Sequence, residues 1–416
     1  MAKILCAWEL GGGFGHLTRL LPVARALQQA GHEVVIAVPD PDVARTMAGR
    51  YFPEGTAPLI KGIRWRAAND PDIKKKPTPI LADVLSLVQF SEFERLAAMV
   101  RVWRRVLETH KPDMIVADFA PTLRLAAWES RPFIVIGSGY TVPPAGRLLP
   151  PIKPWLEVVY PFSRIHEAEV WQAVNRIRRV LKGSAIDYVS DLFNGDASFV
   201  CSIPEFDPYQ AYRQQASLMP FNVPVMRHSP PVASRGERAP IFVYLASHHP
   251  FLKMVLQQIS ITGWPTHAYI SGVEPEKLVK LAGKNISLHR QPLNLEENLW
   301  KFRLIIHHGG MGTTYAAVKA GTPQLLLPIH LEDHVTAHGL KKIGGSLMQS
   351  ASAGKMSDPS ACTSEFAANL QKLLQPSDLW HQAQQAAIIA SKRPESDGVQ
   401  VIVDRCLECL SSLGTV

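Results

Sequence analysis

The sequence predicts an α/β protein built from two doubly wound domains. Short apolar runs alternate with helical periodicity twice along the 416 residues, and a polar, proline-rich stretch separates the two series. In each series an apolar run leads into glycines and then into a helix, the order expected at the edge of a parallel sheet. At about 100–200 residues per domain the length suits two domains. With 46% hydrophobic and 19% charged residues, the composition excludes a largely disordered chain.

The first series opens with a strand–helix–strand unit. Lys3–Trp8 is an apolar run, Gly11–Gly15 forms a glycine-rich turn, and apolar residues then recur at helical spacing over Leu17–Leu27. Because Pro22 has no amide proton, we expect this helix to start late or to kink there. Glu33–Pro39 is the second buried strand, which completes a βαβ unit of the length that a parallel sheet requires.

The remainder of the first domain is less regular. We expect one long helix from about Ile80 to His110, a strand at Asp113–Asp118, a helix at Pro121–Ser130 and a strand at Phe133–Gly137. The proline-rich residues 141–235 are expected to be capping helices and loops.

The α/β alternation then restarts. The predicted strands of the second series are Ile241–Ala246, Thr266–Ile270, Ile286–His289, Leu304–His307 and Gln324–Leu327, with helices at Phe251–Ser260 and Thr313–Ala320.

We therefore predict an N-terminal domain at 1–225, a linker at 226–238, a second domain at 239–376 and a helical tail at 377–416. The tail is free to pack back on the first domain. A ligand is expected in a cleft between the domains, beyond the carboxyl ends of the strands.

Charge and cysteine content narrow the class of protein. The net charge of +8 is spread over the whole chain, so it permits nucleotides, phosphates or a lipid surface as partners without indicating nucleic acid. No apolar run reaches the roughly 18 residues that a membrane helix needs. Five cysteines are an odd and sparse count, which favours a reducing, cytoplasmic environment over a disulfide framework.

The first candidate for chemistry is the turn that ends in His16. Glycines allow the backbone to pass close to a ligand, and the following helix offers unpaired N–H groups. The G-x-G-x-G spacing misses the dinucleotide fingerprint by one residue, so NAD binding with Asp40 on the ribose is the weaker interpretation. A tight turn without a ligand is the plain alternative. His16 argues against it, because a titratable group lies where parallel sheets bind ligands.

The second candidate is Asp118, the last residue of a predicted strand. Its side chain is expected at the same edge of the sheet as His16. A carboxylate beside an imidazole fixes the tautomer and stabilises the imidazolium, as a general base requires. The alternative is that Asp118 only caps the helix that starts near Pro121.

The third candidate is the segment from His307 to Thr313. Here a buried strand leads into glycines and a helix N-terminus that offer N–H groups, a hydroxyl and an imidazole, the donors that suit a diphosphate. Glu332 and Asp333 follow the next strand and are placed to bond the hydroxyls of a ligand.

These motifs, taken in order, resemble those of the bacterial nucleotide-sugar glycosyltransferases of the GT-B type. The matching elements are GGGFGH, PDMIVADFAP, HHGGMGTTYAAVKAGTPQLLLP and EDHVTAH, and the resemblance spans nearly the whole chain. The C-terminal block is its specific part. The resemblance implies two Rossmann-like domains that face each other across a cleft, with the acceptor bound by the first and the nucleotide sugar by the second.

The resemblance also implies roles for individual residues. His16 would be the base, Asp118 its partner, and Gly12, Gly13 and Gly15 the acceptor-side loop. The donor site implied consists of His308, Gly309, Gly310, Gly312 and Thr313 around the diphosphate and Glu332 and Asp333 near the sugar.

Two positions depart from the family pattern. Ala316 stands where many members have a ribose-binding Glu, so UDP remains the first expectation and a dTDP-sugar, which has no 2′-hydroxyl, is the alternative. Glu332-Asp333 replaces the usual Asp-Gln pair, which leaves the sugar open.

We expect an inverting, metal-independent glycosyltransferase without a cofactor. The acceptor would carry a hydroxyl on a small molecule or a lipid, and Trp65, Trp155 and Trp171 in the irregular segments favour an apolar one. Three alternatives remain: a nucleotide-sugar epimerase or hydrolase, an NAD-dependent oxidoreductase, and a non-catalytic nucleotide-sugar-binding protein.

Other polar features have simpler interpretations. Asp40-Pro41-Asp42 and Asp70-Pro71-Asp72 are expected to be turns and not metal sites. Cys406-x-x-Cys409 fits one face of a helix better than a zinc or redox site. His248-His249 suits a ligand site and a capping role equally. Lys74–Lys76 is expected in a solvated loop, with attraction of a phosphorylated or membrane-bound acceptor as the alternative.

Overall fold

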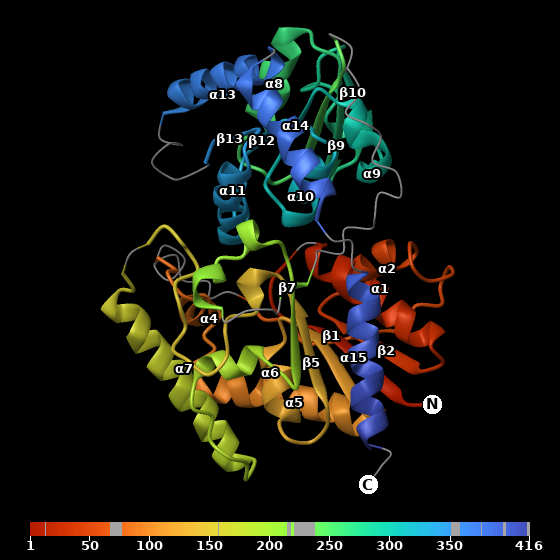
Figure 1. The fold of residues 1–416 in the computed structure, drawn as a ribbon, viewed down its shortest axis with the longest axis vertical. Helices are drawn as coiled ribbons and strands as arrows, with labels where there is room; N and C mark the ends of the chain where they lie inside the picture. Colours follow the sequence, from red (N-terminus) through yellow and green to blue (C-terminus); the bar gives the residue numbers. More distant parts are fainter. Residues whose placement is uncertain are drawn as a thin grey trace. The chain divides into compact units, whose positions relative to one another are not determined.

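The computed structural model describes residues 1–12, 14–66, 77–156, 158–213, 218–219, 238–350, 358–375, 377–393 and 397–413. The chain forms two compact units (Figure 1). Unit 1 is Met1–Asn222 with Glu395–Val416, and unit 2 is Val223–Pro394. All but the last residue of the predicted linker 226–238 lies outside the described residues.

Unit 1 contains a seven-stranded parallel sheet in the order β3-β2-β1-β4-β5-β6-β7. The strands are β1 Lys3–Trp8, β2 Glu33–Val38, β3 Leu59–Lys61, β4 Met114–Asp118, β5 Phe133–Gly137, β6 Ala197–Cys201 and β7 Leu218–Met219. Since β2 and β4 pair with opposite sides of β1, the strand order reverses at β1, and the ligand site of such a sheet lies at that point. The register pairs Trp8 with Asp118, so both strands end at one level.

Seven α-helices of unit 1 are described. They are α1 Gly15–Gln29, α2 Pro41–Ala48, α4 Leu81–Leu87, α5 Phe93–His110, α6 Pro121–Ala127, α7 Pro161–Val180 and α15 Gly398–Leu413.

Three expectations for unit 1 were wrong. Of the two outcomes expected at Pro22, the late start is wrong: α1 begins at Gly15 and runs through Pro22, because its buried leucine face outweighs one missing hydrogen bond. The helix expected over 80–110 is two helices, interrupted where Gln89 has a φ of 57°. Residues 141–235 contain the strands β6 and β7 as well as helices, since their apolar pattern is too short to stand out.

Unit 2 contains a six-stranded parallel sheet in the order β10-β9-β8-β11-β12-β13. The strands are β8 Ile241–Ala246, β9 Thr266–Ser271, β10 Ile286–His289, β11 Leu304–His307, β12 Gln324–Leu326 and β13 Ser346–Met348. The described helices are α8 Leu252–Thr262, α9 Leu295–Asn298, α10 Met311–Lys319, α11 Leu331–Ile343, α13 Pro359–Leu374 and α14 Asp378–Ser391. The order reverses between β8 and β11, which places the end of β11 at the switch point.

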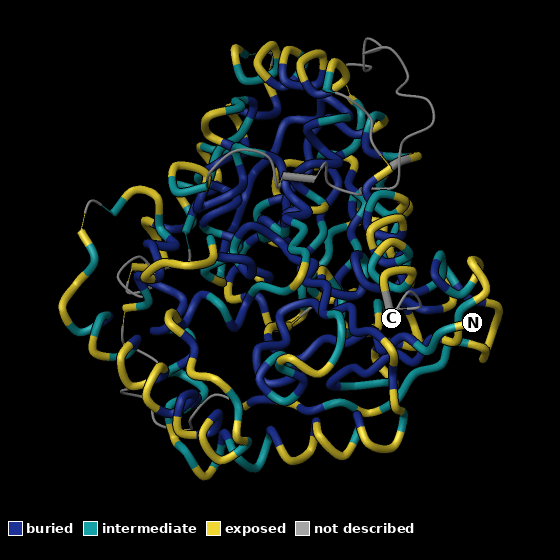
Figure 2. The backbone as a smooth tube through the Cα atoms, turned by 60° about the horizontal axis from the view of Figure 1, so that its bottom comes forward, coloured by how far each residue is buried: buried dark blue, intermediate teal, exposed yellow. Residues whose placement is uncertain are grey.

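The core of each unit lies between its sheet and the helices that cover it. Figure 2 shows the buried residues in dark blue in the interior and exposed residues on the outer turns. Ile4, Ile36 and Val116 of three adjacent strands share one core with Leu20 of α1 and Cys406 of α15. The predicted tail 377–416 is divided, since α14 packs on α10 in unit 2 whereas α15 packs on α1 in unit 1. The predicted fold class, two doubly wound α/β domains, is confirmed.

Among the residues that the structure describes, no helix combines the length and the hydrophobicity needed to cross a bilayer.

Candidate active site

His16 lies in the first turn of α1 at the carboxyl edge of the unit 1 sheet, and the structure brings it onto Asp118. Its Nδ1 is 2.9 Å from Oδ1 of Asp118, and the His16 residue is only 3% exposed. A carboxylate can only accept, so Nδ1 donates to Asp118 when it carries the ring proton. The lone pair of His16 is then on Nε2, the arrangement that a general base needs.

Asp118 has a second partner that sequence reasoning missed. Arg19, one helical turn beyond His16, donates from Nε to Oδ2 of Asp118 at 2.9 Å. Burial by itself raises the pKa of Asp118, but the charges of Arg19 and His16 bring it below its ordinary value. Asp118 is therefore an ionised carboxylate. The sequence could have indicated this partner, because His16 and Arg19 are three residues apart and such residues share a helix face.

The capping alternative for Asp118 is wrong. Ala120 is the N-cap residue of α6, and both oxygens of Asp118 are bonded to His16 and Arg19.

Two aromatic side chains hold the plane of the imidazole. The ring of Trp8 stacks on His16 with centroids 4.9 Å apart and an interplanar angle of 17°. Phe119 stacks on His16 at 6.2 Å and also 17°. Trp8 and Phe119 end β1 and follow β4, so the paired strands bring them together.

Among the described glycines of this turn, Gly11 occupies a position where a side chain would clash with His16. Its φ is 88°, and a Cβ there would lie 2.4 Å from Nε2 of His16. Of the predicted acceptor-side glycines, Gly12 has no atom within 4 Å of its Cβ position, and Gly15 has only Arg19 at 3.9 Å. Gly13 lies outside the described residues. The absence of a side chain at Gly11 leaves the nitrogen that would take a proton free of a steric clash.

Glu9 is a further buried acid that the sequence did not single out. Its carboxylate accepts from the indole N–H groups of Trp65 at 2.7 Å and Trp103 at 3.0 Å, and from the backbone N–H of Leu123 at 3.1 Å. Burial raises the pKa of Glu9 to about 7, against these hydrogen bonds, which lower it. Glu9, next to Trp8, thus joins the end of β1 to the N-terminus of α6. The sequence feature that could have indicated a role for Glu9 is its position as a charged residue at the end of an apolar run.

In unit 2 the predicted diphosphate turn joins β11 to α10. The helix begins at Met311, two residues before the predicted start, so Gly312 and Thr313 both lie in its first turn. A Cβ on Gly310 would lie 3.1 Å from Nε2 of His308, which places that imidazole over the start of the helix. The first N–H groups of an α-helix have no partner within the helix. The turn therefore places N–H groups, Thr313 and an imidazole at the start of one helix.

His307 stabilises this turn through hydrogen bonds of both ring nitrogens. It is fully buried, its Nε2 is 3.0 Å from Oε1 of Gln324, and its Nδ1 accepts from the Gly309 N–H at 3.2 Å. Gln324 in turn donates to the Thr314 carbonyl at 3.2 Å. Burial lowers the pKa of His307 to about 3, so this residue is a neutral structural histidine.

His308 is also neutral near pH 7. Burial, with the nearby His330 and His248, lowers the pKa of His308 to about 4. No hydrogen bond or ion pair joins it to a carboxylate within the described part of the chain. A neutral imidazole beside a helix N-terminus suits donation to an anion.

Glu332 and Asp333 lie in the first turn of α11. Oδ2 of Asp333 accepts from the His330 N–H at 3.1 Å and so caps the helix, and burial raises its pKa to about 6. A Cβ on Gly309 would lie 3.2 Å from the Asp333 carbonyl oxygen, so the diphosphate turn touches the start of α11. The structure thus brings all the predicted donor residues to one edge of the sheet, with one oxygen of Asp333 used in the cap.

The remaining features have structural roles where they are described. Asp40 caps α2 by accepting from the Val43 N–H at 3.2 Å. His249 is buried, with Nε2 2.9 Å from the Leu327 carbonyl oxygen and Nδ1 accepting from the Phe251 N–H, whereas His248 is exposed. Asp70-Pro71-Asp72 and Lys74–Lys76 lie outside the described residues. Nowhere in the described ranges do three or more His, Cys, Asp or Glu side chains form a group able to hold a metal ion.

Comparison with known proteins points in one direction, although no family model matches the chain. The chain is 24% identical over 345 residues to L-demethylnoviosyl transferase of Streptomyces niveus, covering 80% of this chain and 82% of that protein. It is 23% identical over 363 residues to a PGL/p-HBAD biosynthesis glycosyltransferase of Mycobacterium tuberculosis, covering 80% and 77%.

Solved structures agree over the whole length. The spinosyn rhamnosyltransferase SpnG superimposes with a TM-score of 0.66 and 18% identity, over 98% of this chain and 100% of that one. The calicheamicin glycosyltransferase CalG4 superimposes with a TM-score of 0.64 and 19% identity, over 99% and 98%. SpnG has also been solved with spinosyn aglycone and with thymidine diphosphate.

The two-domain fold is that of the GT-B glycosyltransferases. The resemblance that the sequence motifs indicated is confirmed, and the enzyme class is confirmed with it, since the named relatives and neighbours are all glycosyltransferases.

Proposed function

We propose that the protein is an inverting glycosyltransferase that moves a sugar from a nucleoside diphosphate to a hydroxyl acceptor. The observation that carries the proposal is the hydrogen-bonded pair of His16 and Asp118 at the switch point of unit 1. An epimerase or hydrolase would need only the donor site of unit 2, and a non-catalytic binding protein would need no ionised partner for His16.

On the acceptor side, His16 is the general base. Asp118 holds the Nδ1 proton and stabilises the imidazolium that forms, while Arg19 keeps Asp118 ionised. Nε2 takes the acceptor's proton as the acceptor oxygen attacks the anomeric carbon. A Cβ on Gly11 would lie 2.4 Å from Nε2, so glycine at this position keeps a side chain away from the nitrogen that takes the proton. Such a base typically supplies about 100- to 10,000-fold in rate.

On the donor side, the bond between the anomeric carbon and the diphosphate oxygen breaks, and negative charge collects on the diphosphate. The N-terminus of α10 and the His308 imidazole stabilise that charge, in the role that a metal ion plays in other transferases. Thr313 donates its hydroxyl to the same group. We propose that Glu332, and the oxygen of Asp333 not used in the helix cap, bond the sugar hydroxyls.

For the nucleotide we favour dTDP over UDP. Ala316 is buried on α10, so this position provides no carboxylate for a ribose 2′-hydroxyl, and dTDP has no such hydroxyl. The structural neighbour SpnG has been solved with thymidine diphosphate.

For the acceptor we favour an apolar molecule, either small or lipid-like. The segment that precedes and enters α7 exposes large apolar side chains, among them Leu148 at 55%, Val158 at 69% and Ile165 at 58%. Trp155 and Tyr160 are exposed in the same segment. Exposed apolar groups gathered in one segment mark a binding surface. With Arg147 and Lys153 nearby, they also suit peripheral contact with an anionic membrane.

The test is a thermal-shift comparison in EDTA of dTDP, UDP and NAD, followed by a transfer assay. A nucleotide at 100 times its dissociation constant adds about 2.7 kcal/mol to the free energy of unfolding. We expect stabilisation by dTDP or UDP and none by NAD, followed by sugar transfer only when an acceptor alcohol is present. Stabilisation by NAD alone overturns the proposal. Sugar release at full rate without an acceptor identifies a hydrolase, and a strict metal requirement overturns the role given to α10.

A further inference from the structure

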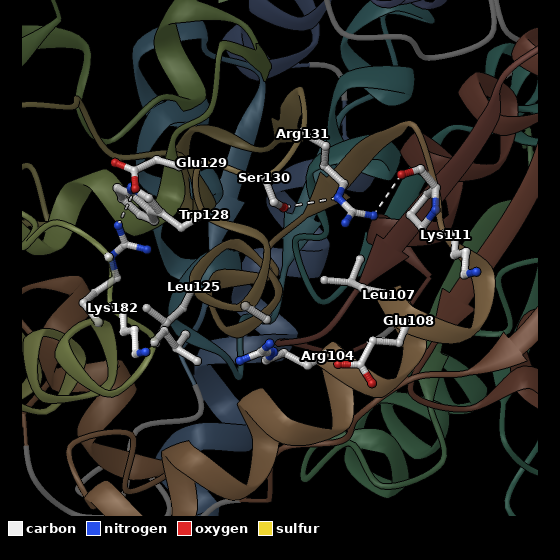
Figure 3. Close-up of a pocket in the computed structure, with 15 residues that line it drawn as sticks. Arg104, Leu107, Glu108, Lys111, Leu125, Trp128, Glu129, Ser130, Arg131 and Lys182 are labelled. Carbon is white, nitrogen blue, oxygen red and sulfur yellow. Dashed lines mark hydrogen bonds and ion pairs between the residues drawn. The ribbon is translucent and has the colours of Figure 1, made fainter.

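A cavity of about 520 Å³ lies in unit 1 at the edge of the sheet opposite the proposed active site. It forms where α5, α6 and α7 end, and Pro112 and Arg131, which precede β4 and β5, belong to its wall (Figure 3). Asp118 is at the other end of β4. At roughly 3.3 Å per residue, the five residues of β4 separate the two places by about 17 Å. The cavity is therefore distinct from the site of His16.

The lining of this cavity combines an apolar floor with a cationic rim. Trp128 contributes apolar surface, while Leu107 and Leu125 belong to the wall but are buried. In the view of Figure 3, Arg104 and Lys182 lie at the bottom and Arg131 at the top of the hollow. The five cations of the lining are Arg104, Lys111, Arg131, Arg178 and Lys182, and its two carboxylates are Glu108 and Glu129.

Most of the positive charge on this rim is not used within the protein. Arg178 is paired with Glu129 at 2.9 Å, and Arg131 donates from Nη1 to the Pro112 carbonyl at 2.8 Å. Arg104 and Lys182 make no side-chain hydrogen bond or ion pair with another described residue. The side chains of Lys111 and Glu108 likewise have no such bond within the described residues. Burial lowers the pKa of Arg131, which agrees with an incompletely compensated cation. The lining has a net charge of +3, from five cations and two carboxylates.

The backbone provides an independent observation. Lys111, Glu129 and Lys182 have φ values of 45°, 59° and 58°, in the left-handed region where glycine is the usual residue. They are three of the five non-glycine residues with positive φ among those described. A helix C-terminus favours the two lysines but not Glu129, so the helix dipole does not account for all three. All three residues lie at or just past a helix C-terminus, where a left-handed residue commonly ends the helix, so three helix ends place charged side chains around one hollow.

We propose that this cavity binds a small amphiphilic anion, a phosphate or carboxylate group on an aromatic or short aliphatic body. The volume is in the range of small-molecule sites. The anionic group pairs with Arg104, Lys182 and the remaining N–H groups of Arg131, and the apolar body lies on Trp128. The site goes beyond the proposed transferase activity and takes no part in its chemistry.

The experiment is calorimetric titration of the full chain with phenyl phosphate, with benzyl alcohol as the neutral probe. Arg104→Gln/Lys182→Gln removes two rim charges that have no described partner, so the melting temperature should not change. Arg105→Gln/Arg179→Gln is the matched control, because these exposed cations lie next to Arg104 and three residues before Lys182 in the chain but outside the lining. We expect saturable binding of phenyl phosphate, none of benzyl alcohol, and at least roughly tenfold weaker binding in the first variant only.

Each other outcome overturns the proposal. Absence of saturable binding by the wild-type protein shows that the hollow is not a site. Equal weakening in both double variants shows a general attraction to a basic surface. Displacement of phenyl phosphate by dTDP shows that the probe occupies the donor site of unit 2, and in that case the proposed function stands while the second site does not.

Discussion

The two glycine turns of this protein have similar sequences and opposite electrostatics. In unit 1 the turn leads to His16, whose Nδ1 is bonded to a buried carboxylate held ionised by Arg19. In unit 2 the turn carries His308, which is surrounded by other histidines and whose pKa is lowered to about 4. Both histidines lie at a strand-to-helix junction at the switch point of a parallel sheet.

The difference teaches that the partner of an imidazole, and not the turn that presents it, sets its chemistry. A histidine with a carboxylate behind it gains stability when it takes a proton. A histidine among other histidines and at a helix N-terminus loses stability when it does so, and it acts as a neutral donor to an anion. Four changes test this assignment of a base to unit 1 and an anion-binding donor to unit 2.

The largest effect is expected from His16→Ala. Transfer should fall by about 100- to 10,000-fold because the acceptor's proton has no base, while the donor dissociation constant stays near that of wild type. Rate and calorimetric measurements on the same preparation separate the two. Wild-type rates from about pH 6 to 8 would remove His16 from the mechanism. Failure of the variant to fold would make His16 a structural residue of the turn.

Gly11→Ala should come next. A Cβ at this position would lie 2.4 Å from Nε2 of His16, so the imidazole must move and transfer should fall by more than about 100-fold. Gly12→Ala is the matched control, since nothing lies within 4 Å of its Cβ position. Equal activities of the two variants would show that the space beside Nε2 has no role.

Asp118→Asn should affect stability as well as rate. Transfer should exceed that of His16→Ala, because an amide can still hold the ring. Loss of the buried charge opposite Arg19 should cost about 3–5 kcal/mol in the free energy of unfolding. Because the folded-state pKa of Asp118 is lowered, its stabilisation is present above the unfolded value of about 3.9 and is lost as pH falls through the folded value. Melting curves of wild type and variant should therefore converge only in acid, and a gap that is constant down to the lowest pH would contradict the ionised state.

The smallest effect is expected from His308→Ala. Loss of a hydrogen bond to a charged group, about 1.5–3 kcal/mol, should weaken binding of the nucleoside diphosphate but not of the nucleoside. An anion raises the pKa of a neighbouring imidazole, so binding of a nucleotide sugar to wild type should strengthen as pH falls from neutral toward the value of about 4 in the free protein. This pH dependence should disappear in the variant. Equal weakening of diphosphate and nucleoside would show that His308 acts through packing.

Much of this molecule could be predicted from local patterns. The buried runs at Lys3–Trp8, Phe133–Gly137 and Leu304–His307 are strands with the expected bounds, because alternation of apolar runs, glycine turns and helical spacing is encoded locally. The same rule placed His16 and Asp118 at one edge, since parallel strands bring their carboxyl ends together. Patterns of two or three residues, such as β7 and β13, are too short for this kind of inference.

The sequence by itself determined the two doubly wound domains, the glycine turns and the residue types that each turn presents, because these depend on spacing along one chain. Only the tertiary structure decided the partners. Arg19 pairs with the carboxylate of Asp118. The rings of Trp8 and Phe119 stack on the His16 imidazole. Glu9 accepts hydrogen bonds from the indoles of two distant tryptophans. The cationic cavity likewise exists because three helices separated in sequence end side by side. Such contacts follow from strand register and helix packing, which no local pattern specifies, and they decide which group each histidine is bonded to.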